Sequence, residues 1–389
     1  MLSSSLAAPL AIYIHWPFCA KKCPYCDFNS HVSNTIDPTA WQKAYEQELK
    51  YYRFLTGPRR VESVFFGGGT PSLMPPFLVE SILKNIHDFW GLEINTEVTL
   101  EANPGSVETD KLAGFKTAGV SRLSIGIQSL EDSALKFLGR IHSAADGFRA
   151  INIANSLFDR VSFDLIYARP NQTTAEWKEE LTRALGYATG HLSLYQLTIE
   201  PETPFYIAHS RGEFSIPDED LSADLYILTE ELTTAAGLPS YEISNYARMG
   251  HESRHNLTYW HYDDYIGIGP GAHGRITLNG VKYATRAHRA PDIWRSKVKT
   301  CGHGAHPFTP IDLPTRGVES LMMGLRLTSG FDLLKIEKES SAPWTDMIVE
   351  SRIITLVDHG DMIRTGTHIQ LTRAGRLRLN QILLYLLHG

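Results

Sequence analysis

The stretch over residues 13–28, YIHWPFCAKKCPYCDF, decides the fold of this chain. It begins within a β-branched and aromatic run that predicts a strand over residues 11–15, and it places Cys19, Cys23 and Cys26 in the loop that follows. A disulfide framework would need even pairing in an oxidising compartment. Three thiols with three and then two residues between them therefore indicate a metal site.

The three cysteines leave two kinds of metal site open. Three thiolates can bind three irons of an iron–sulfur cubane, and the fourth iron then stays free to bind a small molecule. A Cys3His zinc site is the alternative, with His31 or His15 as the fourth ligand. Cys301 stands alone in the sequence, and we interpret it as a small, partly buried apolar side chain.

Strand and helix patterns alternate through the first 240 residues. A helix over residues 39–54 is expected because Asp37 can cap it, Pro38 suits its first turn and Gly57 follows its end. The alternation implies an α/β fold with a parallel sheet. Short β-branched and aromatic runs predict its six strands at residues 11–15, 63–66, 96–100, 122–127, 161–167 and 191–197.

Residues suited to chemistry follow several of these strands. Cys19, Gly68, Glu101, Gln128 and Asp164 all fall at or near predicted carboxyl ends. An open sheet would gather such residues at one switch point, whereas a barrel collects them from many strands. The sequence therefore predicts a partial (βα)6, TIM-like barrel over residues 1–240.

The remaining sequence divides into two further units. Residues 241–306 are dense in Tyr, His and Gly and are expected to form a linking region. Residues 307–389 predict a C-terminal helical, winged-helix-like domain, with helices over 317–327, 344–359 and 372–387 and a hairpin over 362–371. The hairpin between helices is the feature typical of a winged helix.

Composition and charge limit the partners of the chain. With 37 Lys and Arg against 43 Asp and Glu, the formal charge is −6, which argues against nucleic acid as the main partner. No apolar run approaches the roughly 20 residues needed to cross a bilayer. Residues 1–10 lack a cationic region followed by an apolar one, so we expect a cytoplasmic protein without a secretory signal.

The motifs resemble those of the radical S-adenosylmethionine (SAM) superfamily. The resemblance rests on the Cys-x3-Cys-x2-Cys loop after the first predicted strand and on GGGTP over residues 67–71 after the second. Within that superfamily, YIHWPFC (13–19), LSIGIQS (123–129) and FDLI (163–166) resemble oxygen-independent coproporphyrinogen III oxidase and its sister family, the HemW haem chaperones. The resemblance covers nearly the whole chain.

This resemblance implies a set of cofactor contacts. Cys19, Cys23 and Cys26 would ligate a [4Fe-4S] cluster whose open iron is chelated by the amine and carboxylate of SAM. The residues implied to surround the cluster loop and SAM are Tyr13, Tyr25, Gly68, Gly69, Thr70, Glu101, Gln128, Arg140 and Asp164. Carboxylates and amides suit the hydroxyls and amine of SAM, and a guanidinium suits its carboxylate.

Two features separate the sister families. The oxidase carries a further cysteine two residues after the third cluster cysteine, but Phe28 stands there in this chain. Residues 255–260, HNLTYW, resemble the His-Asn-x-x-Tyr-Trp motif of HemW. In that motif His255 could ligate haem iron, Asn256 could orient the ligand or a propionate, and Tyr259 and Trp260 could flank the macrocycle.

A purely structural role for the motif stays open beside haem binding. A His and an Asn beside two aromatic residues also suit a hydrogen-bonded structural corner, and His251, His261 and His273 lie nearby as competing ligands. The sequence does not rank them.

The resemblance implies a haem chaperone that binds haem and delivers it to haem-dependent client proteins, with respiratory-chain proteins as the expected clients. Its cofactors would be a [4Fe-4S] cluster, SAM and haem, and its contacts would include a homodimer and at most a transient membrane association. No catalytic residue is assigned, because turnover of SAM is left open. The alternatives are a radical SAM decarboxylase of coproporphyrinogen III and a zinc-stabilised barrel of unknown substrate.

Overall fold

All six predicted strands are present in the computed structural model of the chain, which describes residues 8–33 and 35–388. Residues 1–7, 34 and 389 of the expected first and last units lie outside the described residues. Neighbouring strands run parallel in the sheet order β1-β4-β5-β6-β7-β8, which confirms the α/β prediction. The strands are β1 (Leu10–Trp16), β4 (Val61–Gly68), β5 (Glu97–Ala102), β6 (Arg122–Gln128), β7 (Arg160–Tyr167) and β8 (His191–Gln196).

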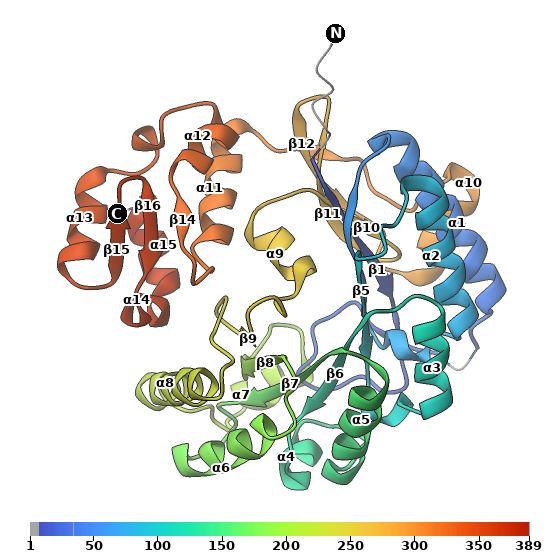
Figure 1. Cartoon of the computed structure of the whole chain (residues 1–389), viewed down its shortest axis with the longest axis horizontal. Helices are drawn as coiled ribbons and strands as arrows, with labels where there is room; N and C mark the ends of the chain where they lie inside the picture. Colours follow the sequence, from blue (N-terminus) through green and yellow to red (C-terminus); the bar gives the residue numbers. More distant parts are fainter. Residues whose placement is uncertain (1–7, 34, 389) are drawn as a thin grey trace.

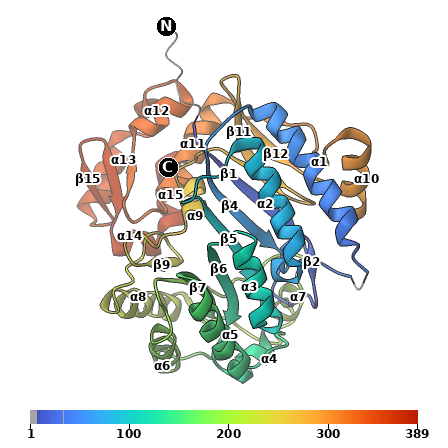
Figure 2. The ribbon, with the colours of Figure 1, turned by 45° about the vertical axis from the view of Figure 1, so that its right-hand side comes forward.

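Helices cover the outer face of the curved sheet (Figures 1 and 2). The predicted first helix is found as α1, which begins where the Asp37 carboxylate accepts from Thr39 N and Ala40 N and ends at Gly57. The helices that follow these strands are α1 (Pro38–Thr56), α2 (Pro76–Trp90), α3 (Thr109–Thr117), α4 (Asp132–Phe137), α5 (Ala144–Leu157), α6 (Thr174–Leu185), α7 (Pro204–Ser210) and α8 (Glu219–Ala235), with short 3-10 turns at η1 (Pro71–Leu73) and η2 (Pro104–Ser106).

Residues 241–306, expected to link two units, contribute strands to the same sheet. β10 (Tyr265–Ile268) pairs parallel with β1, and β9 (Asn245–Ala247) pairs antiparallel with β8. Further antiparallel pairs bring in β11 (His273–Leu278) and β12 (Val281–Arg286), and α9 (Arg254–Trp260) and α10 (Pro291–Cys301) complete the segment. β13 (Thr309–Pro310), which lies after the segment, pairs antiparallel with β12. The glycines that interrupt these short strands hide their β pattern in the sequence.

The inner face of the sheet is polar although it is buried. Alternate residues of the central strands, including Glu97, Thr99, Arg122, Ser162 and His191, are almost inaccessible. The intervening residues are apolar and pack on the outer helices, as Val98 and Leu100 do. The period of two along a strand therefore separates a hydrophobic outer core from a polar barrel interior.

The C-terminal residues form a separate hydrophobic core around a small sheet of order β14-β16-β15. The predicted hairpin is confirmed, whereas the predicted terminal helix is broken at Arg378, and only a 3-10 turn η3 (Trp344–Asp346) precedes α13. The elements are α11 (Leu313–Gly324), β14 (Phe331–Asp332), α12 (Leu334–Ser340), α13 (Glu350–Asp358), β15 (Met362–Thr365), β16 (His368–Leu371), α14 (Arg373–Leu377) and α15 (Leu379–His388).

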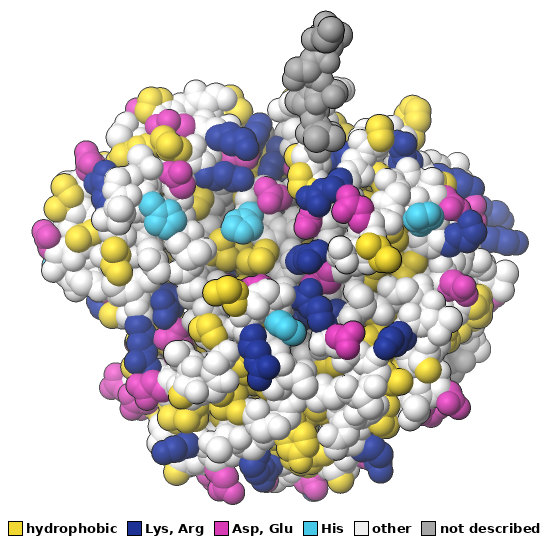
Figure 3. Space-filling view, viewed as in Figure 1, with side chains coloured by type: hydrophobic (Ala, Val, Ile, Leu, Met, Phe, Trp, Pro, Cys, Tyr) yellow, Lys and Arg dark blue, Asp and Glu magenta, His cyan; other side chains and the backbone are white. Residues whose placement is uncertain are grey.

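Ion pairs join this C-terminal part to the large sheet and its helices. Arg376 binds Glu230 of α8 at 2.6 Å, and Arg275 of β11 binds Glu319 of α11 at 3.0 Å. On the face shown in Figure 3, cationic and anionic side chains are interspersed. No helix among the described residues combines the length and the apolar character needed to span a membrane.

Candidate cluster and cofactor site

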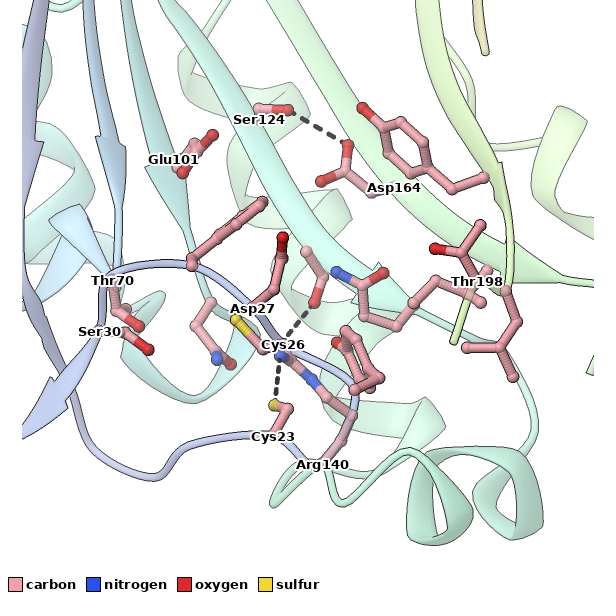
Figure 4. Close-up of a pocket in the computed structure, with 18 of the residues that line it drawn as sticks. Cys23, Cys26, Asp27, Ser30, Thr70, Glu101, Ser124, Arg140, Asp164 and Thr198 are labelled. Carbon is pink, nitrogen blue, oxygen red and sulfur yellow. Dashed lines mark hydrogen bonds between the residues drawn. The ribbon is translucent and has the colours of Figure 1, made fainter. Parts of the chain in front are cut away.

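The cysteine loop connects two short strands at the carboxyl end of β1. These strands, β2 (Phe18–Cys19) and β3 (His31–Val32), pair in parallel and close the loop at its base. All three cysteines are half-buried, and burial raises the pKa of the Cys19 and Cys26 thiols. Cys26 N donates to the Cys23 carbonyl at 3.2 Å, and both cysteines line the cavity whose residues Figure 4 draws.

Two side chains from the barrel donate hydrogen bonds to the thiols. Thr70 Oγ1 lies 3.4 Å from Cys19 Sγ, and Arg140 Nη1 lies 3.4 Å from Cys23 Sγ. Arg140 also donates to the carbonyl of Gly126 at 2.7 Å, which fixes its guanidinium between strand β6 and the loop. Such donors stabilise negative charge on sulfur.

Gly68 and Gly69 occupy positions with no room for a side chain. Gly68 has a φ of +110°, and a Cβ there would lie 2.5 Å from the His15 ring. A Cβ on Gly69 would lie 2.7 Å from the carbonyl oxygen of Phe18. The glycine run therefore lets the end of β4 pass directly against β1 and β2 beside the cysteine loop.

Two half-buried carboxylates face the cavity from β5 and β7 (Figure 4). Burial, with the charge of Asp164 as the second cause, raises the pKa of Glu101 to about 8. Burial raises the pKa of Asp164 to about 6, although hydrogen bonds from Ser193 and Ser124 oppose the shift. Glu101 also accepts from Gly68 N at 3.2 Å. A cationic or hydroxyl-bearing ligand in the cavity would stabilise the ionised form of both carboxyl groups.

Gln128 sits on a strained turn at the end of β6. Its φ of +74° is rare for a residue with a side chain. The turn is fixed from behind by buried Glu180, which accepts from Ser129 Oγ at 2.5 Å and from Leu130 N at 2.8 Å and pairs with Arg169. Strain held in place by a buried network is typical of functional sites.

These groups line one cavity of about 640 Å³. Of the residues predicted to contact the cluster or SAM, Tyr13 is the exception, because its buried ring packs behind Gly67 and its hydroxyl bonds His15. The sequence interpretation missed other lining residues, among them Ser124, Tyr195, Glu200, Tyr226, Ile243 and Ser244. Polar residues at every second position of a predicted buried strand were the signal for Ser124.

The His-Asn-x-x-Tyr-Trp motif forms α9, which packs against β4 at Ser63 and Phe65. His255 is only 1% exposed, and its ring stacks on Phe65 with 4.9 Å between centroids. Its Nδ1 lies 2.9 Å from Ser63 Oγ, and its Nε2 is hydrogen-bonded to the Tyr259 hydroxyl. Burial lowers the pKa of His255 to about 3. Neither ring nitrogen is available to a ligand in this conformation.

The other residues of the motif are also held by the protein. Asn256 lies in the first turn of α9, where its backbone N–H donates to Ser253 Oγ at 3.4 Å. The guanidinium of Arg326, from the C-terminal part, lies 4.7 Å from the centre of the Trp260 ring. The motif helix therefore packs between the sheet and the C-terminal part.

Known proteins resemble this chain in sequence and in fold. Residues 13–184 match the model of the radical SAM superfamily, and residues 311–378 match that of the HemN C-terminal domain. The chain is 35% identical to "Heme chaperone HemW" of Haemophilus influenzae, over 96% of this chain and 97% of the relative. The protein of the same name from Escherichia coli is also 35% identical, with the same two coverages.

The chain belongs to the HemW family. It is also 42% identical to "Radical S-adenosyl methionine domain-containing protein 1, mitochondrial" of Bos taurus, over 82% of this chain and 74% of that protein. The solved coproporphyrinogen III oxidase (HemN) of Escherichia coli has the same fold, with a TM-score of 0.80 and 22% identity over 97% of this chain and 90% of that chain. The predicted barrel with a C-terminal helical domain is thereby confirmed.

Membership of the radical SAM superfamily implies a [4Fe-4S] cluster and SAM in this HemW-family chain, and the donor set fits both. Among residues 8–33 and 35–388, no three His, Cys, Asp or Glu side chains converge on a point where one metal ion could bind. Three thiolates from one loop suit a cubane, because each of them would bind a different iron.

The described geometry does not favour the zinc alternative. His15 donates from Nε2 to the Asn29 carbonyl and accepts the Tyr13 hydroxyl at Nδ1, so both of its ring nitrogens are used. The Nε2 of His31 is bonded to Asn29 Oδ1. Cys301, interpreted as partly buried, is instead exposed at the end of α10.

Proposed function

We propose that this chain is a haem chaperone on a radical SAM scaffold, which binds haem and passes it to haem-dependent acceptor proteins. The observation that carries the proposal is identity of 35% to HemW relatives along nearly the whole length of both chains, C-terminal part included. Phe28, 57% exposed at the position where the oxidase has a cysteine, supports the same choice.

The cofactors would be held by the residues that line the cavity. Cys19, Cys23 and Cys26 would ligate the cluster, and Thr70 and Arg140 would stabilise the thiolates by their hydrogen bonds. A reduced [4Fe-4S] cluster supplies the electron that cleaves the sulfonium of SAM.

The remaining lining residues would bind and orient SAM. Gly68 and Gly69 line the cavity at the end of β4 without side chains to fill it, and the methionine end would lie there. Glu101 and Asp164 would accept from the amine or the ribose hydroxyls, and Gln128 would add an amide contact. Tyr25 lines the cavity beside the cluster loop, whereas Tyr13 would support the site from behind.

Both ring nitrogens of His255 already have hydrogen-bond partners, which bears on its proposed role as a haem ligand. Ligation of haem iron by either ring nitrogen would displace the hydroxyl of Ser63 or Tyr259, and that hydroxyl would lose its hydrogen-bond partner. We therefore propose that His255, Asn256, Tyr259 and Trp260 hold the barrel interior and the C-terminal part together, and that another side chain supplies the axial ligand.

The wider organisation follows from the same proposal. Residues 1–240 would carry the radical SAM core, 241–306 the motif region and 307–389 the C-terminal domain of the HemW family. Such a chain would act in the cytoplasm on haem-dependent acceptors such as respiratory-chain proteins, as a homodimer and with transient membrane contact at most.

The test is an anaerobic reconstitution followed by two assays on the same sample. Haem is titrated into the chain and into His255→Ala by absorption spectroscopy, and coproporphyrinogen decarboxylation is measured in parallel. Haem binding without turnover supports a chaperone, and an unchanged haem spectrum in the variant supports the packing role of His255. Turnover without haem binding would overturn the proposal in favour of the oxidase.

A further inference from the structure

The cysteine loop is closed by Asn29, three residues after its last cysteine. The Asn29 amide nitrogen donates to the carbonyls of Pro270 and Arg289, both at 2.9 Å. Its side-chain oxygen accepts from His31 at 3.3 Å, and its backbone carbonyl accepts from His15 at 2.9 Å. Both amide hydrogens are therefore used, and the side chain cannot turn over without facing donors with donors.

The carbonyls that receive Asn29 lie far away in the sequence. Pro270 follows β10 and Arg289 follows β12, in the strands that extend the sheet beyond β1. Gly271 makes room for the contact, because it has a φ of +78° and a Cβ on it would lie 2.4 Å from Asn29 Nδ2. Its N–H donates to the carbonyl of His288 at 2.9 Å, which keeps the two receiving loops together.

These receiving loops are fixed to the outer helices by one buried carboxylate. Glu48 of α1 accepts from Gly269 N at 2.8 Å and from Gly304 N at 2.7 Å. It also accepts from Trp294 Nε1 at 3.0 Å. The two carbonyls that hold Asn29 therefore belong to a rigid frame rather than to a free loop.

We propose that Asn29 is a positioning residue that holds the three-cysteine loop in its cluster-binding conformation by tying it to the β10–β12 extension. The inference rests on the proposed function for the identity of the bound group, a [4Fe-4S] cluster. A loop already held in shape loses less conformational freedom when it binds, so the tie favours retention of the cluster. It also gives residues 241–306 a part in the site.

The test compares Asn29→Asp with Asn155→Asp. The first change keeps the size of the side chain but turns an oxygen toward two carbonyls. The control makes the same change at a half-buried asparagine that donates to the Tyr187 carbonyl away from the cavity. The cluster-free readout is trypsin cleavage after the exposed Lys21 and Lys22 of the loop.

In Asn29→Asp we expect cleavage in the loop, and iron release from the reconstituted chain to a chelator, to be faster on the order of tenfold or more. The unfolding temperature of the cluster-free chain should stay close to that of Asn155→Asp. Gly271→Ala should also speed cleavage, and by a smaller factor when Asn29 is already alanine, because the clash with the Asn29 amide group is then removed.

Loop cleavage at the wild-type rate in Asn29→Asp would overturn the proposal, as would a rise matched by a general loss of stability. If the wild-type chain binds no cluster, the proposed function fails, but the cleavage assay still decides whether Asn29 holds the loop.

Discussion

Gly69→Ala tests whether the glycine run is required by backbone contact. The added methyl group would lie 2.7 Å from the Phe18 carbonyl oxygen and 2.9 Å from Phe18 C and N. These are backbone atoms that cannot rotate away. Gly69 N also donates to Trp16 O at 2.7 Å and Thr70 N to Phe18 O at 2.8 Å, so the two segments are joined on both sides of the clash.

The size of the effect follows from these contacts. Overpacking of this kind costs about 1–3 kcal/mol. Because the entropy of unfolding grows with chain length, we expect the unfolding temperature of this chain to fall by roughly 1–4 °C. Because Phe18 directly precedes Cys19, the displacement would also reach the cluster loop. We expect less iron per chain after reconstitution and weaker SAM binding.

Gly105→Ala is the matched control, because its φ is not left-handed and no heavy atom lies within 4 Å of the added Cβ. It should be neutral or stabilise the chain by up to about 1 kcal/mol. Calorimetry of the cluster-free chains, iron analysis and SAM equilibrium dialysis measure the three effects. If Gly69→Ala unfolds at the wild-type temperature and binds iron and SAM normally, the steric reasoning is refuted.

Three further perturbations test the buried polar groups. The pKa of Glu101 in the folded chain, about 8, lies above its value in an unfolded chain. The ligand-free protein should therefore lose stability as pH rises through the interval from about 4.5 to 8. Glu101→Gln should make the unfolding temperature less dependent on pH in that interval. Tyr259→Phe removes the partner of His255 Nε2 and should cost about 1–3 kcal/mol in urea unfolding; an unchanged midpoint would contradict the buried hydrogen bond. Arg169→Met leaves Glu180 buried without its cation and should cost about 3–5 kcal/mol while weakening SAM binding, so a variant with normal stability and affinity would separate this network from the site.

Local signals in the sequence were sufficient to predict the strands of the barrel. The strands around Tyr13, Phe66 and Phe163 are short β-branched and aromatic runs, and their type and order depend on neighbours in the chain. The cysteine loop was predictable for the same reason, since its thiols lie within one loop. The strands of residues 241–306 were not predictable, because Gly267 and nearby glycines break the pattern and because β10 pairs with β1, as Tyr265 does with Ala11, 254 residues earlier.

The sequence by itself determined the alternating strands and helices, the three-thiol loop and the residues that resemble those of a SAM site, because each depends on spacing along the chain. Only the tertiary structure decided that His255 is enclosed by Ser63 and Tyr259, and that Asn29 is held by Pro270 and Arg289. Burial and hydrogen-bond partners come from segments that are distant in sequence. Whether a polar side chain faces a ligand or another part of the protein is therefore settled only when the sheet closes around it.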